Sequence, residues 1–130
     1  MTLMELLVVL TILSLLAVTA GTMALSYLDR AKSEASGLRI DQLGTALELF
    51  YLDVGRYPTE EEGLAALLDA PANVESWQGP YLKKREALED GWGVPFLYTN
   101  PGRHGEVDIY SLGADKAEGG DGDNEDVTSW

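Results

Sequence analysis

A long uncharged apolar segment at the N-terminus is the feature that most constrains how this chain can fold. Residues 6–28 contain no Asp, Glu, Lys or Arg, and Asp29 and Arg30 close the segment. A helix needs about 20 apolar residues to cross the hydrocarbon core of a bilayer. The segment is therefore long enough to span a membrane.

The helix is expected to continue well beyond this span. From residue 2 to about residue 52 the sequence contains no proline, which predicts one helix of about 50 residues. Residues 3–28 are apolar on every side, so we expect lipid or other helices to cover them. Beyond them, apolar residues recur at helical spacing, at Ile40, Leu43, Leu47 and Phe50. We therefore divide the chain into a membrane or filament-core half-helix, 1–28, and a globular head, 29–130, that includes the amphipathic half.

The rest of the head predicts an α+β fold. Gly55 and Pro58 end the long helix, and the capping-box pattern that begins at Thr59 predicts a short second helix, which Pro71 stops. Short strands are expected at 95–99, 106–111 and 126–130, with a Pro-Gly-rich turn joining the first two. The long helix should pack on this small antiparallel sheet.

Composition excludes several classes of function. The formal net charge is −13, from 22 acidic and 9 basic residues, which argues against a nucleic-acid partner and a polybasic membrane patch. The chain has no cysteine, so disulfides, thiolate metal sites and thiol catalysis are excluded. His104 is the only histidine, and a nucleophile with its base is hard to build without a second. We expect no enzymatic activity.

Glu5 is the one charged residue within the first 28. An acid at the edge of a membrane helix is costly and usually functional, with a partner of opposite charge. The nearest candidate is the α-amino group of Met1, which a neighbouring chain can bring to Glu5 more easily than the same chain. This pairing would set the register between packed helices. The alternative is an ordinary acid that lies in water at the interface.

An acidic, glycine-rich segment near the C-terminus is the second candidate site. Six acids lie within 12 residues, at Asp115, Glu118, Asp121, Asp123, Glu125 and Asp126. Calcium takes six to eight oxygen ligands from carboxylates, carbonyls and water. The alternative is a solvated, disordered acidic tail. A metal site is favoured because a strand-like segment precedes this loop, and because Val127 and Trp130, which follow it, should anchor in the core.

Several motifs in one order resemble those of a known family. Thr2-Leu3-Met4-Glu5-Leu6 is similar to the mature N-terminus of type IV pilin-like proteins. Tyr57-Pro58-Thr59, Gly79-Pro80-Tyr81, Trp92-Gly93-x-Pro95 and Ser111-Leu112-Gly113-Ala114-Asp115 resemble the major pseudopilins of type II secretion systems. The resemblance covers nearly the whole chain. It departs at Met1, where the family usually has Phe, and at Thr22, where many relatives have Pro.

The resemblance implies a structural Ca²⁺ in the C-terminal loop, 111–128. Carried over by position, Asp115 and Asp126 would supply carboxylates, and Asp123 or Glu125 a further oxygen. Leu112 would supply a carbonyl, and Thr128 a second.

The resemblance also implies a life cycle. A prepilin peptidase would remove a short basic leader and methylate Met1. The subunit would sit in the bacterial inner membrane as a single-pass protein with its head in the periplasm. It would then polymerise into a helical homo-oligomeric filament, the pseudopilus, with minor pseudopilins and an inner-membrane assembly platform as partners, and would drive export of folded proteins across the outer membrane. Two alternatives are a major type IV pilin, against which the lack of cysteine argues, and a membrane-anchored calcium-binding module that never polymerises.

Overall fold

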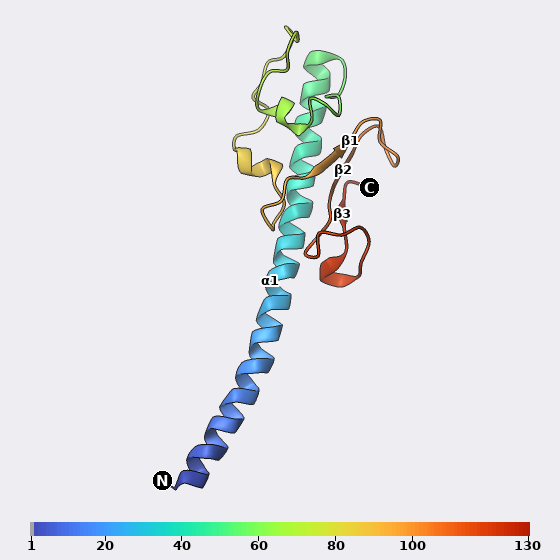
Figure 1. The fold of residues 1–130 in the computed structure, drawn as a ribbon. Coiled ribbons are helices and arrows are strands. Elements are labelled where there is room, and N and C mark those ends of the chain that lie inside the picture. Colours follow the sequence, from blue (N-terminus) through green and yellow to red (C-terminus); the bar gives the residue numbers. More distant parts are fainter. Residues whose placement is uncertain (1) are drawn as a thin grey trace.

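The computed structural model describes residues 2–130, except for the side chain of Asp123. A single long helix forms a stalk that rises through a small head (Figure 1). The elements in chain order are α1 (Leu3–Val54), the 3₁₀ helices η1 (Leu64–Leu67) and η2 (Arg85–Leu88), β1 (Leu97–Thr99), β2 (Asp108–Ser111), the 3₁₀ helix η3 (Gly122–Asn124) and β3 (Val127–Thr128). The predicted α+β class is confirmed.

The helix α1 is continuous, and both of its ends are capped. It starts at Thr2, whose side chain accepts a hydrogen bond from the Glu5 N–H, and it runs through Gly21 and Thr22 without a break. It ends at Gly55, which has φ +85° and donates its N–H to the Tyr51 carbonyl at 2.7 Å. Glycine is common directly after a helix because this position often takes a left-handed backbone conformation, which glycine adopts without strain.

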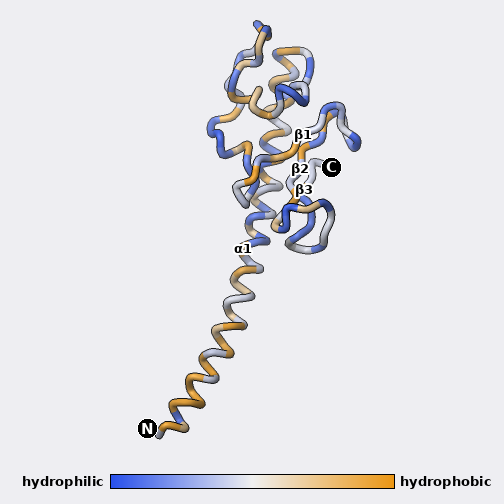
Figure 2. The backbone as a smooth tube through the Cα atoms, viewed as in Figure 1, coloured by the Kyte–Doolittle hydropathy of each residue, from blue (hydrophilic) through white to orange (hydrophobic). Residues whose placement is uncertain are grey.

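The core of the head forms on one stripe of α1. The residues predicted from helical spacing, Ile40, Leu43, Leu47 and Phe50, are all buried. They contact Leu67 of η1, Phe96 before β1 and Ile109 of β2 in one cluster. Since this stripe begins after residue 35, only the second half of α1 contributes buried residues within the described chain. The hydropathy colouring shows the strongly hydrophobic first half extending away from the head (Figure 2).

Three short strands form an antiparallel sheet in the order β1-β2-β3. Tyr98 lies opposite Ile109, and Tyr110 lies opposite Thr128. The predicted strands are present, although each is shorter than the sequence pattern suggested. Because β3 returns alongside β2, the segment between them is a loop tied at both ends rather than a free tail.

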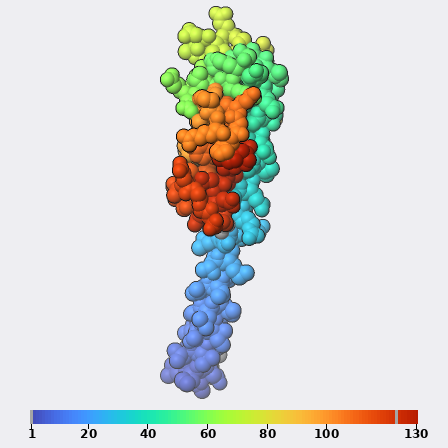
Figure 3. Space-filling view, turned by 90° about the vertical axis from the view of Figure 1, so that its right-hand side faces the viewer, coloured from blue at the N-terminus to red at the C-terminus, as the bar shows by residue number. Residues whose placement is uncertain are grey.

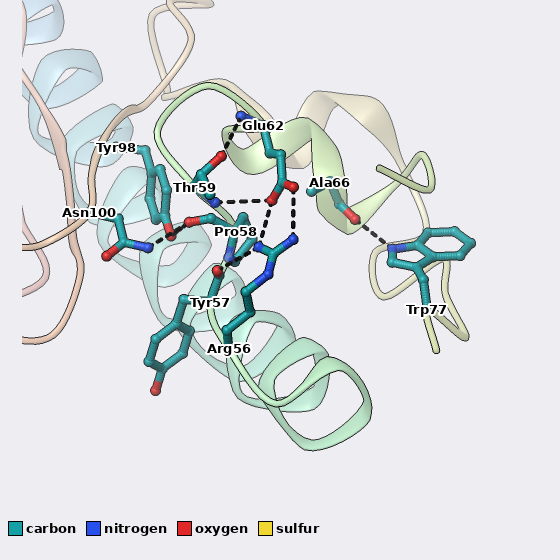
Figure 4. A network of polar contacts seen from close by, with 9 residues as sticks. All are labelled: Arg56, Tyr57, Pro58, Thr59, Glu62, Ala66, Trp77, Tyr98 and Asn100. Carbon is teal, nitrogen blue, oxygen red and sulfur yellow. Dashed lines mark hydrogen bonds and ion pairs between the residues drawn. The ribbon is translucent and has the colours of Figure 1, made fainter. Parts of the chain in front are cut away.

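The predicted second helix is present only as the four-residue 3₁₀ helix η1, which starts at Leu64 and not at Thr59. The capping-box hydrogen bonds do form, since the Glu62 N–H donates to Thr59 Oγ1 at 3.2 Å and the Thr59 N–H donates to Glu62 Oε2 at 3.0 Å. They close only a turn, because Gly63 takes φ +62° and breaks the helical backbone, and the four-residue 3₁₀ helix η1 follows. A two-pronged ion pair fixes this turn, with both contacts from the Arg56 guanidinium to Glu62 at 2.8 Å (Figure 4). The hydrogen bond from Arg56 lowers the pKa of Glu62.

Trp130 is not the core anchor that the sequence suggested. Its side chain is 51% exposed and stacks on the His104 ring, with centroids 3.9 Å apart. Val127 does pack against the core and reaches to within 3.9 Å of the position that a Cβ would take at Gly37 of α1. The anchor of this end of the chain is therefore β3, while the indole covers a surface turn.

Candidate functional site

The N-terminal half of α1 presents an extended exposed apolar surface. An 18-residue window of this half has a mean hydropathy of 2.4, and none of it is buried within the described chain. By length and composition the segment can cross a membrane. Exposed leucines and valines on every side require lipid, or further helices, to cover them. The division of the chain at residue 28 stays a prediction.

Hydroxyl side chains within the apolar half satisfy their own hydrogen bonds. Thr11 Oγ1 donates to the Leu7 carbonyl at 2.8 Å, and Ser14 Oγ donates to the Leu10 carbonyl at 2.7 Å. Thr19 and Thr22 likewise donate to carbonyls one turn back. Since a polar group in hydrocarbon must be satisfied internally, these side chains are compatible with burial in lipid or between helices.

Glu5 caps its own helix in the single chain. The Thr2 N–H donates to Glu5 Oε2 at 3.3 Å, while the Glu5 N–H donates to Thr2 Oγ1 at 3.2 Å. The predicted partner, Met1, lies outside the described residues, so the pairing between chains stays a prediction. Sequence reasoning missed this capping box, although Thr2-x-x-Glu5 is the same pattern that it recognised at Thr59.

The acidic loop folds compactly at the base of the head, beside the point where α1 leaves it (Figure 3). Asp126 Oδ2 accepts a hydrogen bond from the Gly119 N–H at 3.1 Å, whereas Asp126 Oδ1 is buried and has no hydrogen-bond partner among the described residues. Asp115 Oδ1 accepts a local hydrogen bond from the Ala117 N–H at 3.1 Å. A buried carboxylate oxygen without a donor is costly, and a cation beside it would remove that cost.

The other predicted ligands lie around the same loop. Leu112 follows β2 directly, Glu125 directly follows η3, and Thr128 lies in β3 with its hydroxyl donating to the Trp130 carbonyl. The side chain of Asp123 lies outside the described part of the structure. Among the side chains that are described, no three His, Asp or Glu residues lie close enough to hold a metal ion. The fit of calcium therefore depends on no more than two of the described carboxylates together with backbone carbonyls, which calcium accepts as ligands.

Sequence reasoning missed two buried residues beside the loop. Asp90 accepts a hydrogen bond from Ser111 Oγ at 2.6 Å, and Ser111 Oγ accepts one from the Gly113 N–H at 3.2 Å. Ser111 was noticed only as part of a motif, and Asp90 was not noticed at all. An aspartate before Gly91-Trp92 gives no periodic or compositional signal, and only the tertiary structure brings it to the end of β2.

Asp108 forms a second buried carboxylate cluster, with the turn between β1 and β2. Its Oδ2 accepts hydrogen bonds from the Arg103 N–H at 2.7 Å and the His104 N–H at 3.2 Å, and the His104 ring lies at 3.2 Å. Burial alone would raise the pKa of Asp108, but these hydrogen bonds outweigh it and hold the pKa below its ordinary value. Beside it, Arg103, Glu118, Asp126 and Trp130 help to line a pocket of about 430 Å³. These hydrogen bonds hold the turn against the start of β2.

Comparison with protein families identifies relatives of the whole head. The model of the family described as "Type II secretion system (T2SS), protein G" matches residues 23–130. The chain is 38% identical to the type II secretion system core protein G of Pseudomonas aeruginosa, over 99% of this chain and 92% of that protein. It is 36% identical to the protein of the same name from Vibrio cholerae, over 99% of this chain and 89% of that protein.

A solved structure supports the same relationship at the level of the fold. The crystal structure of the major pseudopilin from the type 2 secretion system of enterohaemorrhagic Escherichia coli superposes with a TM-score of 0.67. The two chains are 28% identical, and the match covers 78% of this chain and 85% of that one. The long helix and the three-stranded sheet are thus shared with that protein.

Proposed function

The chain belongs to the type II secretion system protein G family, and from this premise we propose that it is the structural subunit that polymerises into the pseudopilus. The observation that carries the proposal is the exposed apolar surface of the first half of α1, residues 3–28, none of which belongs to the hydrophobic core of the described head. Packing of this half against other copies would remove its apolar surface from lipid or water and hold the filament together. The role is structural rather than enzymatic.

The apolar segment 3–28 also suggests where the protein resides in the cell. We propose a single span of the bacterial inner membrane with the head in the periplasm, release of the mature N-terminus by a prepilin peptidase, and methylation of Met1. Minor pseudopilins and an inner-membrane assembly platform would be the partners. Family membership favours this role over that of a major type IV pilin, and over a calcium-binding module that never polymerises.

The proposed pairing of Glu5 with a neighbour's amino terminus can be separated from its capping role. Glu5→Gln keeps a side chain that can accept the hydrogen bond from the Thr2 N–H but removes the charge. Thr2→Ala removes half of the capping box but keeps the charge. We expect Glu5→Gln to insert into the membrane and form no filaments, and Thr2→Ala to form filaments.

Membrane fractionation followed by electron microscopy of sheared filaments measures both steps, in a host that produces the other components of the secretion system. Normal filaments from Glu5→Gln would contradict the pairing. Loss of filaments in both variants, or in Thr2→Ala alone, would assign the effect to the helix cap instead.

We also propose that Ca²⁺ binds in loop 111–128, with Asp115 and Asp126 as side-chain ligands, Leu112 and Thr128 as carbonyl ligands, and Asp123 or Glu125 completing the set. The buried, unpartnered Asp126 Oδ1 supports this proposal. Bound calcium would supply the positive charge that the loop's carboxylates lack, so that its binding free energy becomes folding free energy. Within the loop, the hydrogen bond from the Gly119 N–H to Asp126 Oδ2 already holds these two residues together.

Thermal unfolding of the full chain in detergent, with Ca²⁺ or with EDTA, tests the site. Asp115→Ala should lower the melting temperature in Ca²⁺ and leave it unchanged in EDTA. Asp121→Ala is the matched control, because it removes an exposed acid from the same loop that is outside the predicted ligand set. An equal decrease with and without calcium, or an equal effect of the control, would argue against the site.

A further inference from the structure

A buried chain of hydrogen bonds lies between the acidic loop and α1, and none of its members belongs to the predicted ligand set. Its side chains are Asp90, Ser111 and Ser36, which are 3%, 2% and 0% exposed. They come from three separate segments: the turn after η2, the end of β2, and α1. Buried polar side chains outside the core usually have a specific structural reason.

Asp90 is the centre of this chain. Its Oδ2 accepts the hydrogen bond from Ser111 Oγ at 2.6 Å, and its Oδ1 accepts the N–H groups of Trp92 at 2.9 Å and Val94 at 3.0 Å. Three donors from two segments hold the carboxylate in one orientation. Because the Ser111 hydroxyl proton is used on Asp90, the Ser111 oxygen is left as an acceptor pointing at the next donor.

That next donor is the backbone of the acidic loop. The Gly113 N–H donates to Ser111 Oγ at 3.2 Å, which closes a tight corner around Leu112. Gly113 takes φ +76°, and a Cβ there would lie 2.8 Å from the Glu125 carbonyl oxygen. The corner therefore lies directly against the other end of the loop, one residue before Asp126. Fixing the corner fixes both ends of the proposed ligand set relative to each other.

We propose that Asp90 is a positioning residue for calcium, acting through Ser111 to hold the Leu112 carbonyl and the Asp126 end of the loop in binding geometry. This inference rests on the proposed calcium function of the same loop. Residues that orient metal ligands without touching the metal commonly change metal affinity about 10- to 100-fold when they are replaced. Asp90 and Ser111 thus set the affinity of the loop.

The other end of the chain provides a matched control. Ser36 Oγ accepts the Gly91 N–H at 2.8 Å and donates to the Lys32 carbonyl at 2.7 Å. Ser36→Ala therefore removes a buried hydroxyl from the same network, on the side of α1, without touching the corner at Gly113. Ser111→Ala removes a hydroxyl of the same kind on the side of the loop.

Calcium titration calorimetry on the full chain in a non-ionic detergent tests the proposal. We expect Ser111→Ala and Asp90→Asn to raise the Kd for Ca²⁺ by about tenfold or more, and Ser36→Ala to leave the Kd unchanged. All three should lower the melting temperature in EDTA, since each removes a buried hydrogen bond. Amide hydrogen exchange at Gly113 without calcium should accelerate in Ser111→Ala and not in Ser36→Ala.

The outcomes are distinguishable. A wild-type Kd in both Ser111→Ala and Asp90→Asn would overturn the positioning role while leaving the calcium site intact. An equal loss of affinity in Ser36→Ala would overturn it by assigning the effect to general destabilisation. No calcium binding by the wild type would overturn the calcium proposal and this one together. If Asp90→Asn does not fold, Ser111→Ala alone decides.

Discussion

The two halves of α1 have the same secondary structure and opposite relations to the rest of the chain. In the second half, one stripe is buried by the head, with Leu47 only 1% exposed. In the first half, every large apolar side chain is exposed, and Leu13 is 56% exposed. The apolar surface of α1 is thus covered in two ways: the head covers the second half, and lipid or other subunits must cover the first half. Folding and assembly are separated along one element.

The largest expected effect contrasts one leucine from each half. Leu47→Ala should lower the free energy of unfolding of the head by about 2–5 kcal/mol, because it leaves a cavity in the core. Leu13→Ala should change that free energy by less than about 0.5 kcal/mol, because its side chain has no partner in the head. It should instead lower the yield of filaments.

Denaturant unfolding of the full chain in detergent, followed by tryptophan fluorescence, measures the first quantity. All three tryptophans lie in the head, so the signal reports on that part. Similar destabilisation by the two substitutions would contradict the separation of the halves.

A pair of glycine substitutions gives an intermediate effect. Gly113→Ala should destabilise the head by about 1–3 kcal/mol, because the position needs φ +76° and has the Glu125 carbonyl beside it. Gly21→Ala meets nothing within 4 Å in the single chain, and should favour the helix by up to about 1 kcal/mol. The same two measurements, head unfolding and filament yield, apply. Filaments lost in Gly21→Ala would show that a neighbouring helix needs the space at this glycine.

The smallest expected effect is a dependence of head stability on pH. The pKa of Asp108 is lower in the folded head than in the unfolded chain, so its contribution to stability is complete above about pH 4, the ordinary aspartate range. That contribution is lost as pH falls through the lowered, folded value. Melting temperatures from pH 6 down to pH 2 should show this loss, and Asp108→Asn should show less of it. Identical pH profiles for the two proteins would contradict it.

The sequence predicted the elements whose signals are local. Helical spacing from Ile40 to Phe50 predicted the buried stripe, and Gly55 marked the end of α1. It placed the start of the short second helix too early, at Thr59, because the capping box is also compatible with an isolated turn once Gly63 takes a positive φ. Trp130 was misplaced because a large aromatic side chain near a strand can equally stack on a surface turn.

Some candidate sites could likewise be seen in the sequence, and one could be seen only in the folded structure. The apolar segment and the acidic loop are runs of composition, so they were visible in the sequence, and the loop is indeed tied between β2 and β3. The buried network of Ser36, Asp90 and Ser111 depends on contacts between distant parts of the chain. Its hydrogen bond from the Gly91 N–H to Ser36 Oγ joins residues 55 positions apart. No periodicity reports such a contact, because it depends on how three segments meet in the folded head.

A helical reconstruction of the assembled filament by electron cryomicroscopy would test the central claim most directly. The prediction is that residues 3–28 of neighbouring copies form the filament core and bury one another, while the contacts of the Ile40 to Phe50 stripe with its own head stay as they are in the single chain. A filament held together by head contacts alone, with residues 3–28 unburied, would contradict it.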